Sequence, residues 1–248
     1  MATRRVDAHF VCGGKYHDMD FARLEILRIL GDHDNIRVTV DSDYSNTAAL
    51  ARAEFLITYT CELVPSDQEQ LALERFLDAG KRWFALHGTN SVLRYRKGAG
   101  WEAPRTAPRF MEMLGSQFIA HPPIQPYTVR VSKPEHPLVA NISAFEANDE
   151  LYLCEMRADI ETLLETRWSG MTPGFVEDDW RDDAARPVLY LRRWGNGEVL
   201  YFTLGHARGH YDMQPLMDEY PDIERGSWPT PEFHTILRRG IRWAAREI

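Results

Sequence analysis

Short apolar runs alternate with amphipathic segments through the first ninety residues, and this pattern leaves few folds open to the chain. Four apolar runs predict strands at Ala8–Cys12, Ile36–Val40, Phe55–Tyr59 and Arg82–Leu86. An apolar stripe predicts a helix from about Asp20, closed by Gly31, and the capping box Ser66–Glu69 predicts a second helix that ends at Ala79. Strands separated by helices favour a parallel, doubly wound sheet, whose ligands bind beyond the carboxyl ends of the strands.

The second half of the chain is less regular. We expect a short helix at Phe110–Leu114, strands at Tyr127–Val131 and Leu163–Trp168, and a last helix from about Pro231 to Arg246. The clearest turn signal is Gly195-Asn196-Gly197, which lies between the apolar runs 187–194 and 198–204 and predicts an antiparallel hairpin. The pattern contains no strong domain boundary, so residues 1–248 are expected to form a single domain.

Charge and cysteine content exclude several classes of protein. The formal net charge of −8 argues against general binding to nucleic acid or an anionic membrane. We find no signal peptide and no membrane-length apolar run, so a cytoplasmic protein is expected. Three widely spaced cysteines suggest neither a disulfide framework nor a thiolate zinc site. Gly13-Gly14 lacks the spacing of a dinucleotide or phosphate-binding loop, so no nucleotide is expected.

Histidines supply the main chemical signal. Five of the nine follow predicted strands or lie in loops marked by glycine or proline: His17, His87, His121, His206 and His210. Imidazole at such positions serves as a proton shuttle or a metal ligand, whereas any one of them taken alone more often caps a turn. The spacing of His206 and His210 suits a helical metal pair, but the neighbouring glycines argue against a helix there.

Carboxylates and aromatic residues offer fewer candidates. Glu150 could be a metal ligand or a general base, and Tyr152 could bind a hydroxyl group, although a solvated turn would give the same pattern. Asp18 and Asp20 fit a helix cap and an exposed charge. The acidic stretch 177–183 could be a lid that carries Trp180, or simply a solvated loop.

Nucleophile signals are poor. The chain has no G-x-S-x-G elbow, which is the usual mark of a serine nucleophile in an α/β hydrolase. Cys12 and Cys61 each lie at a predicted strand end, where buried structural thiols are the commoner case.

Seven short motifs, taken in order, resemble the ThuA-like (trehalose utilisation) family over almost the whole chain. They are Gly13-Gly14 with His17, Ala85-Leu86-His87-Gly88, Phe118-Ile119-Ala120-His121-Pro122, Glu135-His136-Pro137-Leu138, Asn148-Asp149-Glu150-Leu151-Tyr152, the stretch 195–206, and Gly240-Ile241-Arg242-Trp243. The resemblance implies a flavodoxin-like, class I glutamine amidotransferase-like three-layer α/β sandwich. Its central sheet would be mostly parallel, with the antiparallel hairpin near the C-terminus.

The resemblance also points to a lost mechanism. Glutaminases of this superfamily carry a cysteine nucleophile at the elbow where His87 stands here, and a His-x-Glu motif where His206-Ala207-Arg208 stands. The histidine of that motif is kept and the acid is missing. Without a thiolate no acyl-enzyme can form, so we expect no glutaminase activity.

The resemblance implies carbohydrate catabolism through disaccharides and keto-sugars, with a divalent metal held among site histidines. The matching positions are His17, His87, His121, Glu150 and His206. The main hypothesis is therefore a metal-assisted hydrolase, lyase or isomerase that acts on a sugar-like small molecule.

Roles are assigned to residues as follows. The catalytic set is His87, Glu150 and His206; the metal set, for zinc first, is His87, His121 and His206; the substrate-binding set is His17, Asn90, Tyr152, Trp180 and His210. One alternative is a non-catalytic sugar-binding or scaffold module that uses Trp101, Trp180 and Trp228 for stacking. A weaker alternative is an amidohydrolase that uses Cys61, and a homo-oligomer is expected only as a general prior.

Overall fold

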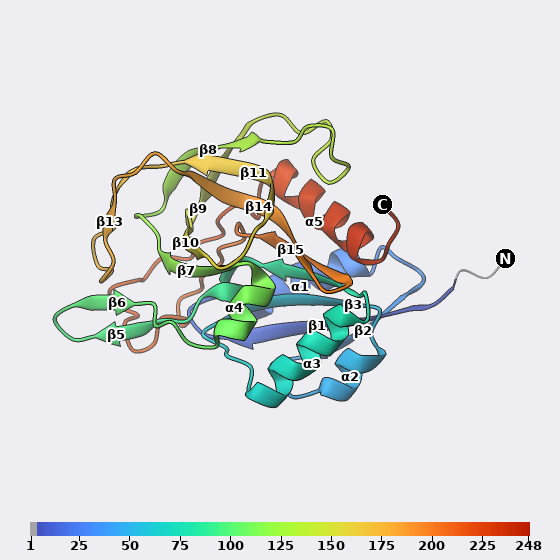
Figure 1. Cartoon of the computed structure of the whole chain (residues 1–248). Coiled ribbons are helices and arrows are strands. Elements are labelled where there is room, and N and C mark those ends of the chain that lie inside the picture. The colour runs from blue at the N-terminus through green and yellow to red at the C-terminus, as the bar shows by residue number, and fades with distance from the viewer. Residues whose placement is uncertain (1–3) are drawn as a thin grey trace.

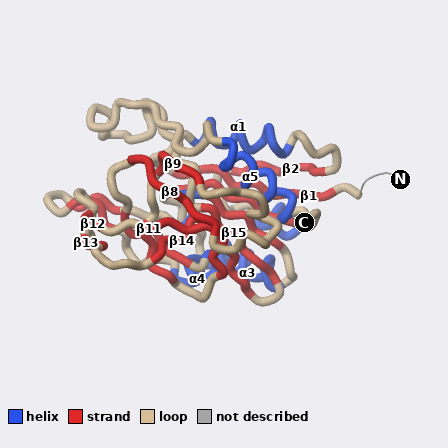
Figure 2. Tube along the Cα trace, turned by 90° about the horizontal axis from the view of Figure 1, so that it is seen from above, coloured by secondary structure: helices blue, strands red, loops and turns tan. Residues whose placement is uncertain are grey.

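The computed structural model describes residues 4–248, in which a nine-stranded sheet lies between two layers of helices (Figures 1 and 2). Five neighbouring strands are parallel; in sheet order they are β2 (Ile36–Asp41), β1 (Val6–Gly14), β3 (Phe55–Cys61), β4 (Arg82–Leu86) and β15 (Gly197–Phe202). The four that follow are antiparallel: β14 (Ala185–Trp194), β11 (Glu161–Arg167), β8 (Gln125–Val131) and β9 (Phe145–Asp149). The predicted three-layer α/β fold is confirmed.

Helices cover both faces of the sheet (Figure 2). On one face lie α1 (Met19–Leu30) and α5 (Pro231–Ala244), and on the other lie α2 (Thr47–Arg52), α3 (Asp67–Asp78) and α4 (Pro108–Leu114). Successive strand residues point to opposite faces. In β4, for example, Phe84 packs in the core beneath α1 and α5, whereas Trp83 packs in the core beneath α3 and α4.

Local signals explain where the first helices begin. Asp18 caps α1 by accepting a hydrogen bond from the Phe21 amide at 3.0 Å, as the sequence suggested. The capping box between Ser66 and Glu69 is present at the start of α3. Gly31 closes α1 in a right-handed conformation with φ of −66°, so its glycine freedom is not needed there.

The predicted hairpin forms between β14 and β15, but its turn differs in detail. Trp194 pairs with Gly197, which leaves Gly195 and Asn196 as the two turn residues. The positive φ belongs to Gly195, at 53°, and not to the Asn-Gly pair that the sequence suggested. A positive φ at the first turn residue alone is the pattern of a type II′ turn, which matches the twist of the strands equally well.

The antiparallel part is larger than this one hairpin, because the irregular middle of the chain adds strands to the sheet and forms small pairs beside it. These pairs are β5 (Arg94–Arg96) with β6 (Gly100–Glu102), β7 (Ser116–Ala120) with β10 (Leu153–Met156), and β12 (Gly170–Met171) with β13 (Asp179–Trp180). The β5–β6 hairpin projects from one end of the molecule, on the side away from the C-terminus (Figure 1). In the described part of the chain, no helix has both the length and the apolar character needed to cross a membrane.

Candidate metal and active site

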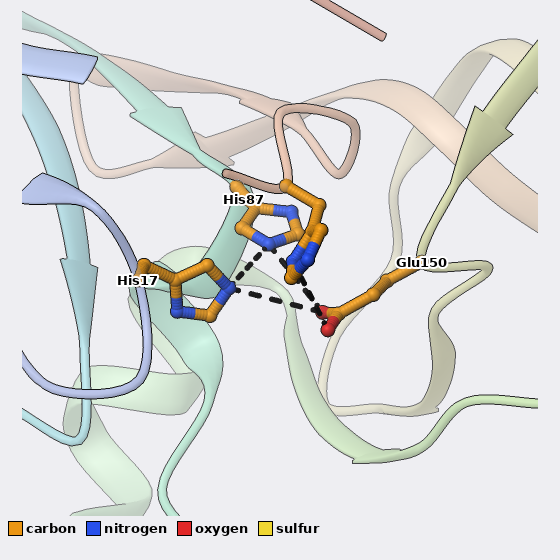
Figure 3. Close-up of side chains that lie close together, drawn as sticks. His17, His87 and Glu150 are labelled. Atoms are coloured by element: carbon orange, nitrogen blue, oxygen red, sulfur yellow. Dashed lines mark hydrogen bonds and ion pairs between the residues drawn. The ribbon is translucent and has the colours of Figure 1, made fainter. Parts of the chain in front are cut away.

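Four buried side chains converge beyond the carboxyl ends of the strands. His17 follows β1, His87 directly follows β4, Glu150 directly follows β9, and His206 follows β15. One ligand atom from each lies within 4.8 Å of the corresponding atoms of the other three. Figure 3 shows His17, His87 and Glu150 pointing toward one another. We call these four residues the His/Glu cluster.

His87 occupies a strained elbow at the end of β4. Its φ is 45°, which a non-glycine residue adopts only when its surroundings impose it. The hydroxyl of Tyr201 donates to the His87 carbonyl, and Nδ1 of the ring lies 2.8 Å from the Thr203 carbonyl. A carbonyl oxygen can only accept, so Nδ1 carries a hydrogen, which leaves Nε2 as the nitrogen that can bind a cation.

His17 presents a lone pair to the same point. Its Nδ1 lies 3.4 Å from the Lys15 carbonyl, and its Nε2 lies 2.8 Å from Nε2 of His87. Burial, only partly offset by Glu150, lowers the pKa of His17 to about 4, so the ring is neutral near pH 7. With both Nδ1 atoms facing carbonyl oxygens, the Nε2 atoms of His17 and His87 face each other, which favours a cation shared between them.

His206 contributes the third nitrogen. Its Nε2 donates to Oε2 of Glu224 at 2.6 Å, and its Nδ1 is buried 3.1 Å from Oε1 of Glu150 with no hydrogen bond of acceptable geometry. Burial opposes protonation, but the negative charge of the nearby Glu150 carboxylate and the hydrogen bond to Glu224 raise the pKa of His206 to about 10. Positive charge is therefore favoured at Nδ1.

Glu150 is the negative centre of the cluster. Its carboxylate oxygens lie 3.8 Å from Nε2 of His17, 3.4 Å from Nε2 of His87 and 3.1 Å from Nδ1 of His206. Burial favours the protonated acid, but the positive fields of His206 and His121 together with hydrogen bonds from the cluster hold its pKa well below its usual range. Glu150 is therefore a buried ionised carboxylate.

Asp149 links the chain segments that carry Glu150 and His206. Its carboxylate accepts from the backbone amides of Gly205 at 3.0 Å, His206 at 3.1 Å, Ser227 at 2.8 Å and Glu150 at 2.9 Å. One buried side chain thus joins the segments after β9, after β15 and before α5. Sequence reasoning noted Asp149 only as an acid beside Glu150, because these four contacts are visible only once the segments meet.

The donor set fits a divalent metal. Imidazole nitrogens and a carboxylate oxygen are both common zinc ligands, and the orphaned Nδ1 of His206 lies among them. The other nitrogen of each histidine faces a carbonyl or carboxylate oxygen, as is usual for metal ligands.

The set differs from the predicted one by two additions and one removal. His17 and Glu150 join His87 and His206, while His121 lies outside, with Nδ1 bound to the Pro122 carbonyl at 2.8 Å and Nε2 3.6 Å from Oε1 of Glu150.

A cavity of about 450 Å³ opens beside the cluster, with His17 and Glu150 in its lining, and is the natural place for a small molecule. Of the predicted substrate-binding residues, His17 and Tyr152 line it, and so does His121. Tyr152 is buried, and its hydroxyl lies 3.3 Å from Nε2 of His87. Burial, followed by the charge of Glu150, raises the pKa of Tyr152 well above its ordinary value, so the phenol keeps its proton.

Asn90, Trp180 and His210 are not among the residues that line the cavity. Asn90 is fully buried and donates to the Ser116 hydroxyl at 2.7 Å, which makes it part of the support beneath the site. Trp180 lies on β13 under the guanidinium of Arg186. His210 is bound to the Pro221 carbonyl within its own loop. The tryptophan that lines the cavity is Trp101, on β6.

Thiol chemistry finds no support in the site. Cys61 lines the cavity, but burial raises the pKa of its thiol far above neutrality, and burial raises the pKa of Cys12 to about 12. The acid partner of His206 is Glu224, which reaches Nε2 of His206 from eighteen residues further along the chain.

Comparison with known proteins agrees with this architecture. The ThuA family model, described as trehalose utilisation, matches residues 9–219. A ThuA-like protein of Bacteroides uniformis is similar in structure at a TM-score of 0.68 and 18% identity, over 98% of this chain and 93% of that one. A ThuA-like protein of Parabacteroides merdae is similar at a TM-score of 0.69 and 13% identity, over 98% of this chain and 91% of that one.

A β-galactosidase of Rahnella sp. R3 is similar at a TM-score of 0.59 and 12% identity, over 98% of this chain but only 32% of the enzyme. The search of curated proteins found no match. At such identities the solved structures establish the fold alone, whereas the family model covers most of the sequence. The chain therefore belongs to the ThuA, or trehalose utilisation, family.

Proposed function

We propose that this protein is a metal-assisted enzyme of carbohydrate catabolism that moves a proton beside the carbonyl group of a sugar derivative. The reaction class is isomerisation, or elimination of the glycosidic group, of a keto-sugar. The observation that carries the proposal is the convergence of His17, His87, Glu150 and His206 on one point beneath a cavity. The family's description as trehalose utilisation supports a sugar-derived substrate.

The four residues of the His/Glu cluster would hold the metal, with zinc as the first candidate. A bound divalent ion supplies Lewis acidity, which polarises a carbonyl oxygen and makes the neighbouring C–H more acidic. Asp149 and Glu224 orient the cluster through the backbone and through His206.

His121 is the residue we assign to proton transfer. It lines the cavity, and its Nδ1 hydrogen is bound to the Pro122 carbonyl, so Nε2 is the nitrogen left free to accept a proton. It lies beside the cluster without belonging to it, which leaves it available as a general base. The protonated phenol of Tyr152 can donate a hydrogen bond to a substrate oxygen. No covalent nucleophile is required.

The first prediction concerns metal content. Protein loaded with zinc and then dialysed should retain about one equivalent, whereas His87→Ala and His206→Asn should each retain less than about a tenth, because each removes one nitrogen ligand. His210→Ala, a histidine outside the cluster, is the matched control and should match the wild type. Elemental analysis measures the ratio, and circular dichroism checks folding. A wild-type protein with less than a tenth of an equivalent would contradict the assignment.

The second prediction concerns Glu224. Glu224→Gln removes the carboxylate that fixes the Nε2 hydrogen of His206, so zinc affinity should fall about 10- to 100-fold. Competition with a chromogenic chelator measures this affinity. Glu219→Gln changes another acid of the same cavity and should leave zinc binding unchanged. Equal affinities for the two variants would show that Glu224 does not orient the ligand.

The third prediction separates proton transfer from metal binding. In D₂O, the wild-type protein should exchange the proton beside the carbonyl in a member of a keto-glucoside panel, as followed by NMR. His121→Ala should retain zinc, and its exchange rate should be about 10²- to 10⁴-fold lower than that of the wild type. If His121→Ala exchanged at the wild-type rate, the base would have to be another residue. If no panel member exchanged with zinc-loaded wild-type protein, the proposed reaction class would be wrong.

A further inference from the structure

One part of the cavity lining consists almost entirely of carbon. Leu93, Trp101, Pro123, Ile124, Pro173 and Phe175 line it, and all are at least partly exposed. Among these six side chains, only the indole of Trp101 carries a hydrogen-bonding group. We call this set the apolar wall.

Two of its aromatic residues are set side by side by the backbone. Trp101 donates its amide to the Gly174 carbonyl at 2.7 Å and accepts from the Val176 amide at 2.8 Å, which pairs it with Phe175 in a parallel bridge. Gly100 makes this approach possible. It has a φ of 95°, and a Cβ there would lie 2.2 Å from the Gly174 carbonyl oxygen.

The indole of Trp101 is also held in place. The ring of Tyr16 meets it edge-on with centroids 5.5 Å apart, and the ring of Tyr95 does so at 5.2 Å. An aromatic surface that is already ordered loses little side-chain entropy when a ligand covers it. This arrangement is typical of a binding surface.

Ring contacts connect the apolar wall to the His/Glu cluster. The ring centroid of Phe175 lies 5.1 Å from that of His121 and 6.0 Å from that of Phe118. From Phe118 the contacts continue to Tyr152, with centroids 4.5 Å apart, and from Tyr152 to His87, with centroids 4.8 Å apart. A molecule that places its reacting carbon at the cluster would therefore extend its substituent along this wall.

The hydroxyl-bearing residues Tyr16 and Ser91 also line the cavity, but most of its charged groups come from one later segment. Apart from the cluster and His121, the charged lining groups Arg208, Glu219, Asp222 and Glu224 all come from the segment 208–224. Hydroxyl groups of a sugar ring can pair with these side chains. Against the wall, hydroxyl groups would lose water without gaining a hydrogen-bond partner.

We propose that the apolar wall is a subsite for a flat apolar group, so that the substrate is a sugar derivative with an aromatic aglycone and not a disaccharide. The part of this inference that concerns the sugar rests on the proposed function. It adds the chemical class of the leaving or carried group, which the cluster alone does not specify.

Binding measurements test the subsite directly. Calorimetry on the zinc-loaded protein compares phenyl glucoside with methyl glucoside, in both anomeric forms, and with cellobiose and trehalose. We expect one phenyl glucoside to bind about tenfold more tightly than its methyl counterpart and than either disaccharide. A disaccharide that binds as tightly as the phenyl glucoside, or no difference between phenyl and methyl glucosides, would overturn the inference.

Substitution locates the effect. Trp101→Ala should reduce the phenyl preference to about twofold or less, with the methyl glucoside affected by less than about twofold. Trp180→Ala, a tryptophan outside the cavity lining, should keep the full preference. Phe175→Leu offers a milder change on the same wall and should lower the preference in the same direction. Equal losses for both glucosides in Trp101→Ala would overturn the assignment.

The outcomes separate this inference from the proposed function. The same titrations on chelator-treated protein should preserve the phenyl preference, because the wall contains none of the cluster residues. If the proposed function failed, zinc binding and proton exchange would be absent while the preference and its dependence on Trp101 remained. If only the inference failed, zinc binding and proton exchange would remain without the preference.

Discussion

The buried carboxylate of Glu150 requires positive charge beside it, and much of the site is arranged around that requirement. A buried ionised acid is costly unless it is paired, and no arginine or lysine in the described residues forms an ion pair with it. Imidazoles surround it instead. Two of them, His17 and His87, have their Nε2 atoms 2.8 Å apart, and His206 directs its Nδ1 toward the same acid. A divalent cation would balance all four groups together.

Backbone geometry delivers these groups to one place. The parallel strands β1, β4 and β15 end at the same edge of the sheet, so the residues that follow them meet there. His87 stands at the strained elbow that directly follows β4, and Glu224 supplies an acid partner for His206.

Local patterns predicted the parallel half of the fold well, because strand runs, the Ser66 capping box and the glycine-marked turn are short-range signals. The same logic placed histidines at strand ends. It could not separate His17 from His121 as a ligand, since both follow strands and only tertiary packing orients their rings. Glu224 lies in an irregular loop with no periodic signal, and Trp101 and Trp180 look alike in sequence although only Trp101 faces the cavity.

The central claim is that the His/Glu cluster is a metal site. A crystal structure of zinc-loaded protein, with anomalous data at the zinc edge, tests it most directly. The account predicts one strong peak bonded to Nε2 of His17, Nε2 of His87, Nδ1 of His206 and a Glu150 oxygen, at about 2.0–2.2 Å. The absence of any peak among these atoms, or zinc bound elsewhere in the cavity with the cluster unchanged, would contradict it.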